Sequence, residues 1–252
     1  MNTASKLIIT ILSIVTVLAI ITGVYIHIYR GFGFRTSSAM TEGSKELEGE
    51  VTEVIFDVDF GDIKVAYGDA FAVSYSMPES LVPTIDLDDG TLNIKSGGNQ
   101  NLSFPFNTSG DYEIYLTLPE GTELESLNIN LDAGNIDIIG IKTADLNMDV
   151  DAGDIELSDI ESDNFRIDVD AGNFELKNVN VGNVTIDVDA GNIDIRKSVI
   201  TKLTADVDAG NIESHDSTIS GGSCEVDMGN ISLNGEIGDV KVKTALGNAS
   251  IN

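Results

Sequence analysis

Aspartate residues recur every 19 residues through the second half of this sequence, each opening an Asp-Ala-Gly-Asn tetrapeptide or a close variant. A second acidic residue usually stands two positions earlier and a third stands five positions later. Repeated carboxylates can bind a divalent cation, supply the acid and base of a hydrolase, or attract a cationic partner. The opening aspartates are Asp132, Asp151, Asp170, Asp189, Asp208 and Asp227.

Calcium is the cation that such carboxylates would suit, because Ca²⁺ takes several oxygen ligands in flexible geometry. The candidate ligands, paired within each repeat, are Asp149, Asp151, Asp168, Asp170, Asp187, Asp189, Asp206 and Asp208. The spacing fails the EF-hand pattern, since glycine falls at the fifth position rather than the sixth and no bidentate glutamate follows. The glycine-rich nine-residue calcium repeat is also absent. The sequence favours a solvated acidic face whose opening aspartates complete a chain corner, and it predicts no cofactor.

An enzymatic role is disfavoured by the uniformity of the acids. A glycoside lyase or hydrolase needs two groups whose environments push their pKa values apart, whereas these carboxylates repeat in one setting. Trp is absent, and the repeats offer only Arg166 and Arg196 as arginines. His215 stands in an outward slot that otherwise holds Ser, Lys, Arg or Asn. We therefore predict no catalytic residues.

The net charge limits which partners the chain can bind, and the cysteine content limits its disulfide bonding. The formal net charge is −28, and residues 1–41 contain three cations and no acid, so the acidity belongs to the rest of the chain. Nucleic acid is excluded as a partner, because its binding requires cations that neutralise phosphates. The one cysteine, Cys224, permits no intramolecular disulfide and falls at an inward position, where we expect an inert core thiol.

Each 19-residue unit predicts short strands joined by a corner. Counted from the opening aspartate, positions −5, −3 and −1 are apolar and mark one strand with a buried face. Positions +4 and +6 are apolar in the same way. The step from −1 to +4 is odd, so the chain must turn at Ala-Gly-Asn. We expect Gly at +2 to supply a positive φ and Asn at +3 to tolerate one while bonding nearby backbone.

A third apolar position follows about nine to eleven residues after each aspartate, which gives two or three strands per turn. The expected inward residues are Ile141, Ile160, Val179, Val199, Ile219 and Ile237. Stacking such units in register pairs equivalent strands about 4.8 Å apart and buries one aliphatic column. The predicted fold is therefore all-β, a parallel β-solenoid of about 19 residues per turn, right-handed by the crossover rule.

The first half of the solenoid is less regular. Residues 51–126 show alternating strands with degenerate corners and most of the Phe and Tyr, and residues 96–110 form a Gly-, Asn- and Ser-rich segment interpreted as an insertion loop. Residues 127–252 carry the regular repeats. We expect the irregular turns to close one end of the stack.

The N-terminal segment predicts a membrane anchor before the solenoid. After a short tail, residues 1–6, residues 7–29 contain no formal charge and are long enough to cross a bilayer as a helix. A cleavable signal peptide is the alternative, but its apolar region would be shorter. Residues 30–50 are interpreted as a juxtamembrane linker. Lys6 on one side and Arg30 and Arg35 on the other leave the orientation undecided by charge. The large acidic domain favours export.

Several segments together resemble a known family. They are VIFDVDFGDIKV, LDDGTLNI and YLTLPEGTELESLNINLDAGNIDI, followed by serial VDAGNIDI units. Over residues 51–252 the chain resembles the β-strand-repeat family of bacterial envelope proteins known as putative adhesins. The resemblance implies an exported, envelope-associated solenoid and carries over no catalytic residue.

The combined expectation is a single-pass membrane protein whose extracytoplasmic acidic solenoid is a structural or interaction module of the cell envelope. Expected partners are the bilayer, through residues 7–29, and cationic envelope components or peptides. The alternative is a sensor or regulatory ectodomain that binds cationic peptides in an envelope-stress response. End-to-end homo-association of the solenoid is a further hypothesis, because an open solenoid edge invites strand pairing.

Overall fold

The computed structural model describes residues 40–97 and 112–252, whose regular elements are strands and one short 3-10 turn, joined by short turns and loops. In that part of the chain no helix has the length and apolar character needed to span a bilayer. The predicted anchor, residues 7–29, and nearly all of the predicted insertion loop lie outside the described residues. Only the start of that loop is described, where Ser96 ends a strand.

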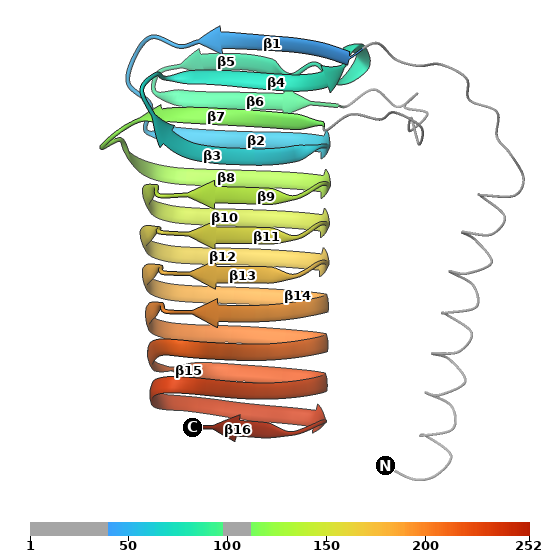
Figure 1. Cartoon of the computed structure of the whole chain (residues 1–252), viewed down its shortest axis with the longest axis vertical. Coiled ribbons are helices and arrows are strands. Elements are labelled where there is room, and N and C mark those ends of the chain that lie inside the picture. Colours follow the sequence, from blue (N-terminus) through green and yellow to red (C-terminus); the bar gives the residue numbers. More distant parts are fainter. Residues whose placement is uncertain (1–39, 98–111) are drawn as a thin grey trace, which may run out of the picture. The chain divides into compact units, whose positions relative to one another are not determined.

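Stacked parallel strands form the regular part of the molecule, as Figure 1 shows. Each strand pairs with its equivalent one turn away, and the register offset is 19 residues, as for Val150 and Val169. The last turn is one residue shorter, since Ile231 pairs with Ala249. The predicted all-β parallel solenoid is confirmed, while its right-handed sense stays a prediction. The strands are β8 (Glu123–Ala133), β9 (Ile136–Ile139), β10 (Lys142–Ala152), β11 (Ile155–Ser158), β12 (Glu161–Ala171), β13 (Phe174–Lys177), β14 (Asn180–Arg196), β15 (Val199–Leu246) and β16 (Ala249–Ile251).

The core is the predicted aliphatic column. Positions −3 and −1 are buried in every repeat, and so are +4 and +6. Position −5 is buried from Leu127 to Leu203, while Gly222 takes this place in the last full repeat. Because identical positions stack turn upon turn, each apolar side chain packs against its own equivalent above and below. The period of two within a strand and of 19 between strands therefore specifies one continuous core.

The glycine corner has a second cause besides the expected positive φ, which only some of its glycines show. Gly134, Gly153 and Gly229 have φ angles of 152–159°, close to the extended region, and Gly191 has no positive φ. A Cβ on Gly191 would overlap the carbonyl oxygen of Gly172 one turn earlier, and the same overlap recurs along the column. Glycine is required here because the backbones of successive turns approach too closely for a side chain.

In the regular repeats the left-handed residues lie at a second corner, position +8, which the sequence prediction missed. Asp159, Asn178, Lys197 and Asp216 have φ angles between 51° and 56°, and Gly140 has 72°. Asn and Asp tolerate this conformation better than Lys does. The sequence signal for this corner is weak, because only the mixture of Gly, Asp and Asn at one position marks it.

The third inward position lies at +9 and +11, so the prediction for Val199 was wrong. Val199 is at +10 and is 49% exposed, whereas Ser198 at +9 is 1% exposed. The inward serine is tolerated because its hydroxyl is bonded. Ser198 Oγ donates to the carbonyl oxygen of Arg196 at 2.8 Å and accepts from the Val179 amide at 3.2 Å. Ser217 is buried in the same way one turn on.

The N-terminal end of the solenoid contains antiparallel strands, which the repeat did not predict. The strands here are β1 (Met40–Glu46), β2 (Glu53–Phe60), β3 (Asp62–Gly68), β4 (Ala72–Pro78), β5 (Thr84–Asp88), β6 (Thr91–Ser96) and β7 (Glu113–Pro119), with a 3-10 turn at Glu79–Leu81. β1 pairs antiparallel with β4, and β5 with β6. Residues 40–46, expected in a linker, are therefore a strand that caps the stack at the end shown uppermost in Figure 1. Pairing with β4 gives these polar residues backbone partners that hydrophobic patterning does not reveal.

Candidate interaction surface

One face of the solenoid carries two exposed columns of carboxylates, which we call the acidic face. Its members stand at positions −2 and 0 on β10, β12, β14 and β15. Asp149, Asp168, Asp187 and Asp206 are aligned in register with one another. The position-0 aspartates lie beside them and are exposed as well. The acidic face consists of Asp149, Asp151, Asp168, Asp170, Asp187, Asp189, Asp206 and Asp208. The structure thus brings all the predicted acidic residues together.

Partial loss of hydration, reinforced by repulsion from neighbouring carboxylates, raises the pKa of several of these residues. The pKa of Asp187 is raised by desolvation first and then by the charges of Asp168 and Asp206. Desolvation and the Asp151 and Asp189 charges raise the pKa of Asp170 in the same sense. The pKa values of Asp132 and Asp206 are also raised. In the folded chain the ionised form of these carboxyl groups is therefore less favourable than it is in water.

Lysine side chains pair with acids at the two ends of the −2 column but not with the aspartates between them. Lys95 Nζ lies 3.4 Å from Asp57 Oδ2 at the N-terminal end, and Lys243 pairs with Glu225 at the C-terminal end. None of the described ion pairs involves the four aspartates of the −2 column, which are Asp149, Asp168, Asp187 and Asp206. In the described part of the chain, no group of three or more His, Cys, Asp or Glu is arranged to hold a metal ion. The acidic face is thus a surface of uncompensated charge, and specific Ca²⁺ binding to it stays a hypothesis.

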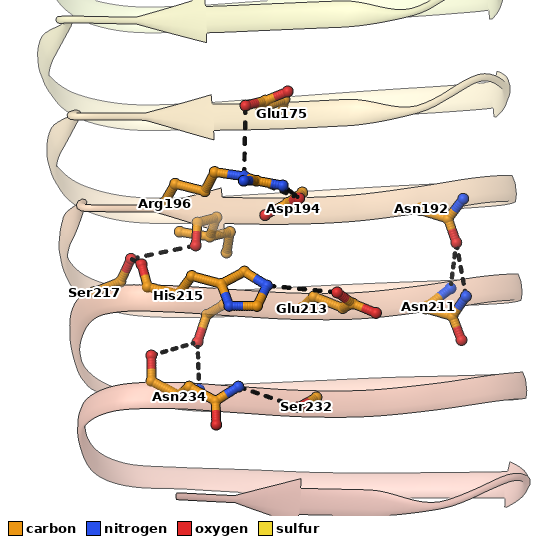
Figure 2. Close-up of polar contacts among 12 residues, drawn as sticks. Glu175, Asn192, Asp194, Arg196, Asn211, Glu213, His215, Ser217, Ser232 and Asn234 are labelled. Carbon is orange, nitrogen blue, oxygen red and sulfur yellow. Dashed lines mark hydrogen bonds and ion pairs between the residues drawn. The ribbon is translucent and has the colours of Figure 1, made fainter.

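A second face, on β9, β11, β13 and the following turns, has charges of both signs. Arg196 Nη2 lies 2.5 Å from Asp194 Oδ2, and its Nε lies 3.7 Å from Glu175 Oε1 one turn earlier. Figure 2 shows the Arg196 side chain joining these two acids. His215 Nε2 lies 3.5 Å from Glu213 Oε2 in the next turn. Position +7 holds Lys177, Arg196 and His215 in three successive turns, and Arg196 pairs with the position +5 acids Asp194 and Glu175.

An asparagine ladder runs beside the glycine corner at position +3. Asn192 Oδ1 accepts hydrogen bonds from both the backbone N–H and the Nδ2 of Asn211, at 3.1 and 2.9 Å. Figure 2 shows this pair, and the contact recurs in neighbouring turns. Asn at +3 therefore joins successive turns, and it does not have the positive φ that the sequence suggested. The recurrence of Asn at +3, replaced by Asp154 in one repeat, was a signal for the ladder, because amide stacking satisfies exposed polar groups in register.

The two nucleophile candidates near His215 and in the core, Ser217 and Cys224, are both buried. Ser217 Oγ donates to the backbone carbonyl of His215 rather than to its ring, at 2.9 Å. Burial raises the pKa of the Cys224 thiol to about 12, so the thiolate needed for reactivity is scarce at neutral pH. His215 lies at the surface, as expected, and contacts an acid of the second face. These groups do not form a nucleophile–base pair.

The regular stack, its glycine corner and its N-terminal cap define a β-solenoid repeat domain. The family model described as Toastrack DUF4097 matches residues 51–252, and the chain belongs to this family. No curated protein matches it. A crystal structure of a putative lipid binding protein from Parabacteroides distasonis is similar, with a TM-score of 0.57, 20% identity and coverage of 83% of this chain and 96% of the other. A putative adhesin from the same organism has a TM-score of 0.50, 15% identity and coverage of 84% and 97%. At these identities the similarity shows the fold alone.

Proposed function

We propose that this protein is a membrane-anchored interaction module of a bacterial cell envelope whose acidic face binds a cationic partner. Residues 7–29 hold it in the bilayer, and the solenoid lies on the extracytoplasmic side. The similar putative adhesin and its family support a module that works by contact. Among the described residues, the acids share one repeated environment, which suits a surface better than an acid–base pair.

The observation that carries this proposal is the uncompensated charge of the acidic face. Asp149, Asp168, Asp187 and Asp206 stand one strand spacing apart in register, about 4.8 Å. At that separation, two carboxylates repel by about 0.9 kcal/mol even in bulk water. A bound polycation replaces this repulsion with attraction. The free energy that the fold stores as repulsion therefore favours the complex over the free protein.

The experiment compares two variants of the full chain with equal charge changes. The face variant carries Asp168→Asn and Asp187→Asn, and the control carries Glu156→Gln and Glu175→Gln on the second face. The probe is an oligolysine peptide, whose binding is measured in detergent at low salt. We expect the face variant to bind roughly tenfold more weakly and the control to change little, because two exposed charged contacts of up to ~1 kcal/mol each are lost.

Two results would overturn the proposal. Equal weakening in both variants would mean that net charge alone attracts the peptide. Unchanged binding in the face variant would mean that the acidic face is not the contact surface. Altered stress-gene induction under cationic-peptide challenge when the gene is deleted, without altered attachment of the cells, would favour the sensor alternative.

A further inference from the structure

Exposed apolar side chains gather at the C-terminal turn of the solenoid, residues 234–252. Leu246 stands at position +1, which is Ala in the first five regular repeats, and it is 53% exposed. Met228 holds the same position one turn earlier and is 48% exposed. Ile251 is 44% exposed, although Leu233, with which it pairs in the preceding turn, is 0% exposed. Three of the five exposed large apolar side chains among the described residues therefore lie in the last two turns, and we call them the apolar end.

The edge of this turn has no strand partner among the described residues. β16 pairs with β15 alone, and Figure 1 shows it at the end of the stack. At the opposite end, β1 pairs antiparallel with β4, and Lys45 Nζ donates to the carbonyl oxygen of Ile85 on β5 at 2.6 Å. The described solenoid is thus covered at its N-terminal end and open at its C-terminal turn. An open strand edge pairs readily with another strand.

The acidic columns stop before the apolar end. Position −2 changes from Glu225 to Lys243, and position 0 changes from Asp227 to Ala245. Position +5 is serine in the last two turns. Residues 234–252 contain two acids and two lysines, so their side-chain charges cancel in a chain whose net charge is −28. A cationic partner would gain nothing from this change, whereas a second, equally acidic copy of the chain is repelled less.

The edge strand also carries charges that complement themselves. Asp239 and Lys241 are exposed and flank the buried Val240. In an antiparallel pair, residues directly opposite each other point to the same face. A two-fold axis through Val240 therefore puts Lys241 of each copy opposite Asp239 of the other. The register centred on Lys241 would instead oppose two lysines, which is unfavourable.

We propose that the C-terminal turn binds the same turn of a second copy of this chain, tail to tail about a two-fold axis. The contact is isologous, so a single pairing covers both open edges and does not continue into a fibre. Leu246 and Ile251 of both copies lose contact with water, and the two aliphatic cores become continuous. Lys241 and Lys243 stand between the acidic faces of the two copies. This inference goes beyond the proposed function and does not rest on it.

The test uses the full chain with one copy in each lipid nanodisc, so that the predicted anchors cannot pair and no detergent covers the apolar end. Sedimentation velocity measures the joining of two nanodiscs. We expect the parent chain to dimerise, and Leu246→Asp with Ile251→Asp to weaken dimerisation roughly a hundredfold or more, because apolar burial is lost in both copies. Ile139→Asp is the matched control, since Ile139 is 45% exposed on β9 and should leave the Kd unchanged.

Charge reversal tests the register. Lys241→Asp alone and Asp239→Lys alone should each weaken dimerisation roughly tenfold, because each replaces two attractive pairs with two like-charged pairs. The chain that carries both substitutions regains opposite charges and should dimerise like the parent chain. Lys177→Asp, the same reversal at an exposed site of the second face, should change the Kd little.

Three results would overturn the proposal. A parent chain that stays monomeric at its highest soluble concentration would leave a lipid surface or another protein as the occupant of the apolar end. Equal dimerisation of the parent chain and the Leu246→Asp, Ile251→Asp variant would place the contact elsewhere. Failure of the charge-swapped chain to recover would contradict the two-fold register. Thermal midpoints establish that each variant is folded, and none of these results bears on oligolysine binding to the acidic face.

Discussion

Gly191 lies directly over Gly172, so close that a Cβ on Gly191 would overlap the Gly172 carbonyl oxygen. The two residues are aligned in equivalent corners of successive turns. The same relationship holds between Gly210 and Gly191 and between Gly153 and Gly134. Each turn of the solenoid therefore fits its neighbour through a side-chain-free backbone contact, and the asparagine ladder beside it fixes the register.

Gly191→Ala should be among the most destabilising single-atom additions in this protein. The new methyl group cannot be placed unless two turns separate, and overpacking of this kind costs at least ~1–3 kcal/mol. Chemical denaturation of the full chain measures the loss. Gly221→Ala is the matched control, because its Cβ would meet the nearest atom, the carbonyl oxygen of Asp239, at an ordinary 3.4 Å. Equal losses in the two variants would contradict the steric account of the corner.

Lys197→Asn should stabilise the fold. Lys197 has a φ of 51°, in the left-handed region, where a long side chain costs about 1 kcal/mol and Asn is better tolerated. Lys177→Asn removes the same charge at an exposed site without a positive φ and should not stabilise. The difference between the two free energies of unfolding, expected at about 0.5–1 kcal/mol, isolates the backbone contribution. A gain in both variants would show that charge, rather than conformation, is responsible.

Acidification should raise the stability of the solenoid over part of the pH range. The folded-state pKa values of Asp132, Asp170, Asp187 and Asp206 are raised above the ordinary 3.8, so the folded chain binds more protons than the unfolded chain does in this window. By linkage, the contribution of these four aspartates to the free energy of unfolding grows as the pH falls from 7 towards 3.8. It is lost as the pH rises through their raised folded-state pKa values. Thermal midpoints measured at low salt follow this change.

Salt and substitution provide the controls for the pH effect. In 1 M salt the Debye length is about 3 Å, so the part of the pH dependence that arises from repulsion should shrink. Asp187→Asn should raise the midpoint at pH 7 and reduce the slope, whereas Asp69→Asn, an exposed site outside the columns, should do neither. A midpoint that falls steadily from pH 7 to about 4.5 would contradict the repulsion account.

Divalent cations should stabilise the acidic face without discriminating between calcium and magnesium. The described carboxylates form columns rather than a closed ligand cage, and diffuse screening depends on ionic charge instead of coordination number. We expect equal rises in thermal midpoint with Ca²⁺ and Mg²⁺ at matched concentration. A larger rise with Ca²⁺, abolished by Asp168→Asn with Asp187→Asn, would instead establish a calcium site between turns.

The 19-residue period in the sequence predicted the buried column and the pairing of successive turns, but not the features that depart from that period. Positions −1 and +4 repeat so regularly that the buried column and the parallel register follow from them. Position +9 changes from Ile and Val to Ser198 and Ser217, and hydrophobicity therefore pointed to the neighbouring Val199. The serines are inward because their hydroxyls bond the local backbone, a contact that no periodicity reports.

The site was predicted in part for the same reason. The carboxylates at −2 and 0 alternate with buried residues, so their common outward face could be inferred. The grouping of Arg196 with Glu175 joins side chains of successive turns, and it required the observed register. The antiparallel pairing of β1 with β4 was not predicted because Met40–Glu46 is polar and lies outside the repeat.

The side of the membrane on which the solenoid lies tests the central claim most directly. A specific protease site inserted between Arg35 and Thr36, in the predicted linker ahead of β1, would separate the whole solenoid, including the β1 strand that pairs with β4, from the predicted anchor. Protoplasts or spheroplasts with an intact cytoplasmic membrane are treated with the protease, and the released domain is detected by immunoblot. The proposed function predicts release without lysis. Release only after lysis would place the acidic face in the cytoplasm and contradict the account.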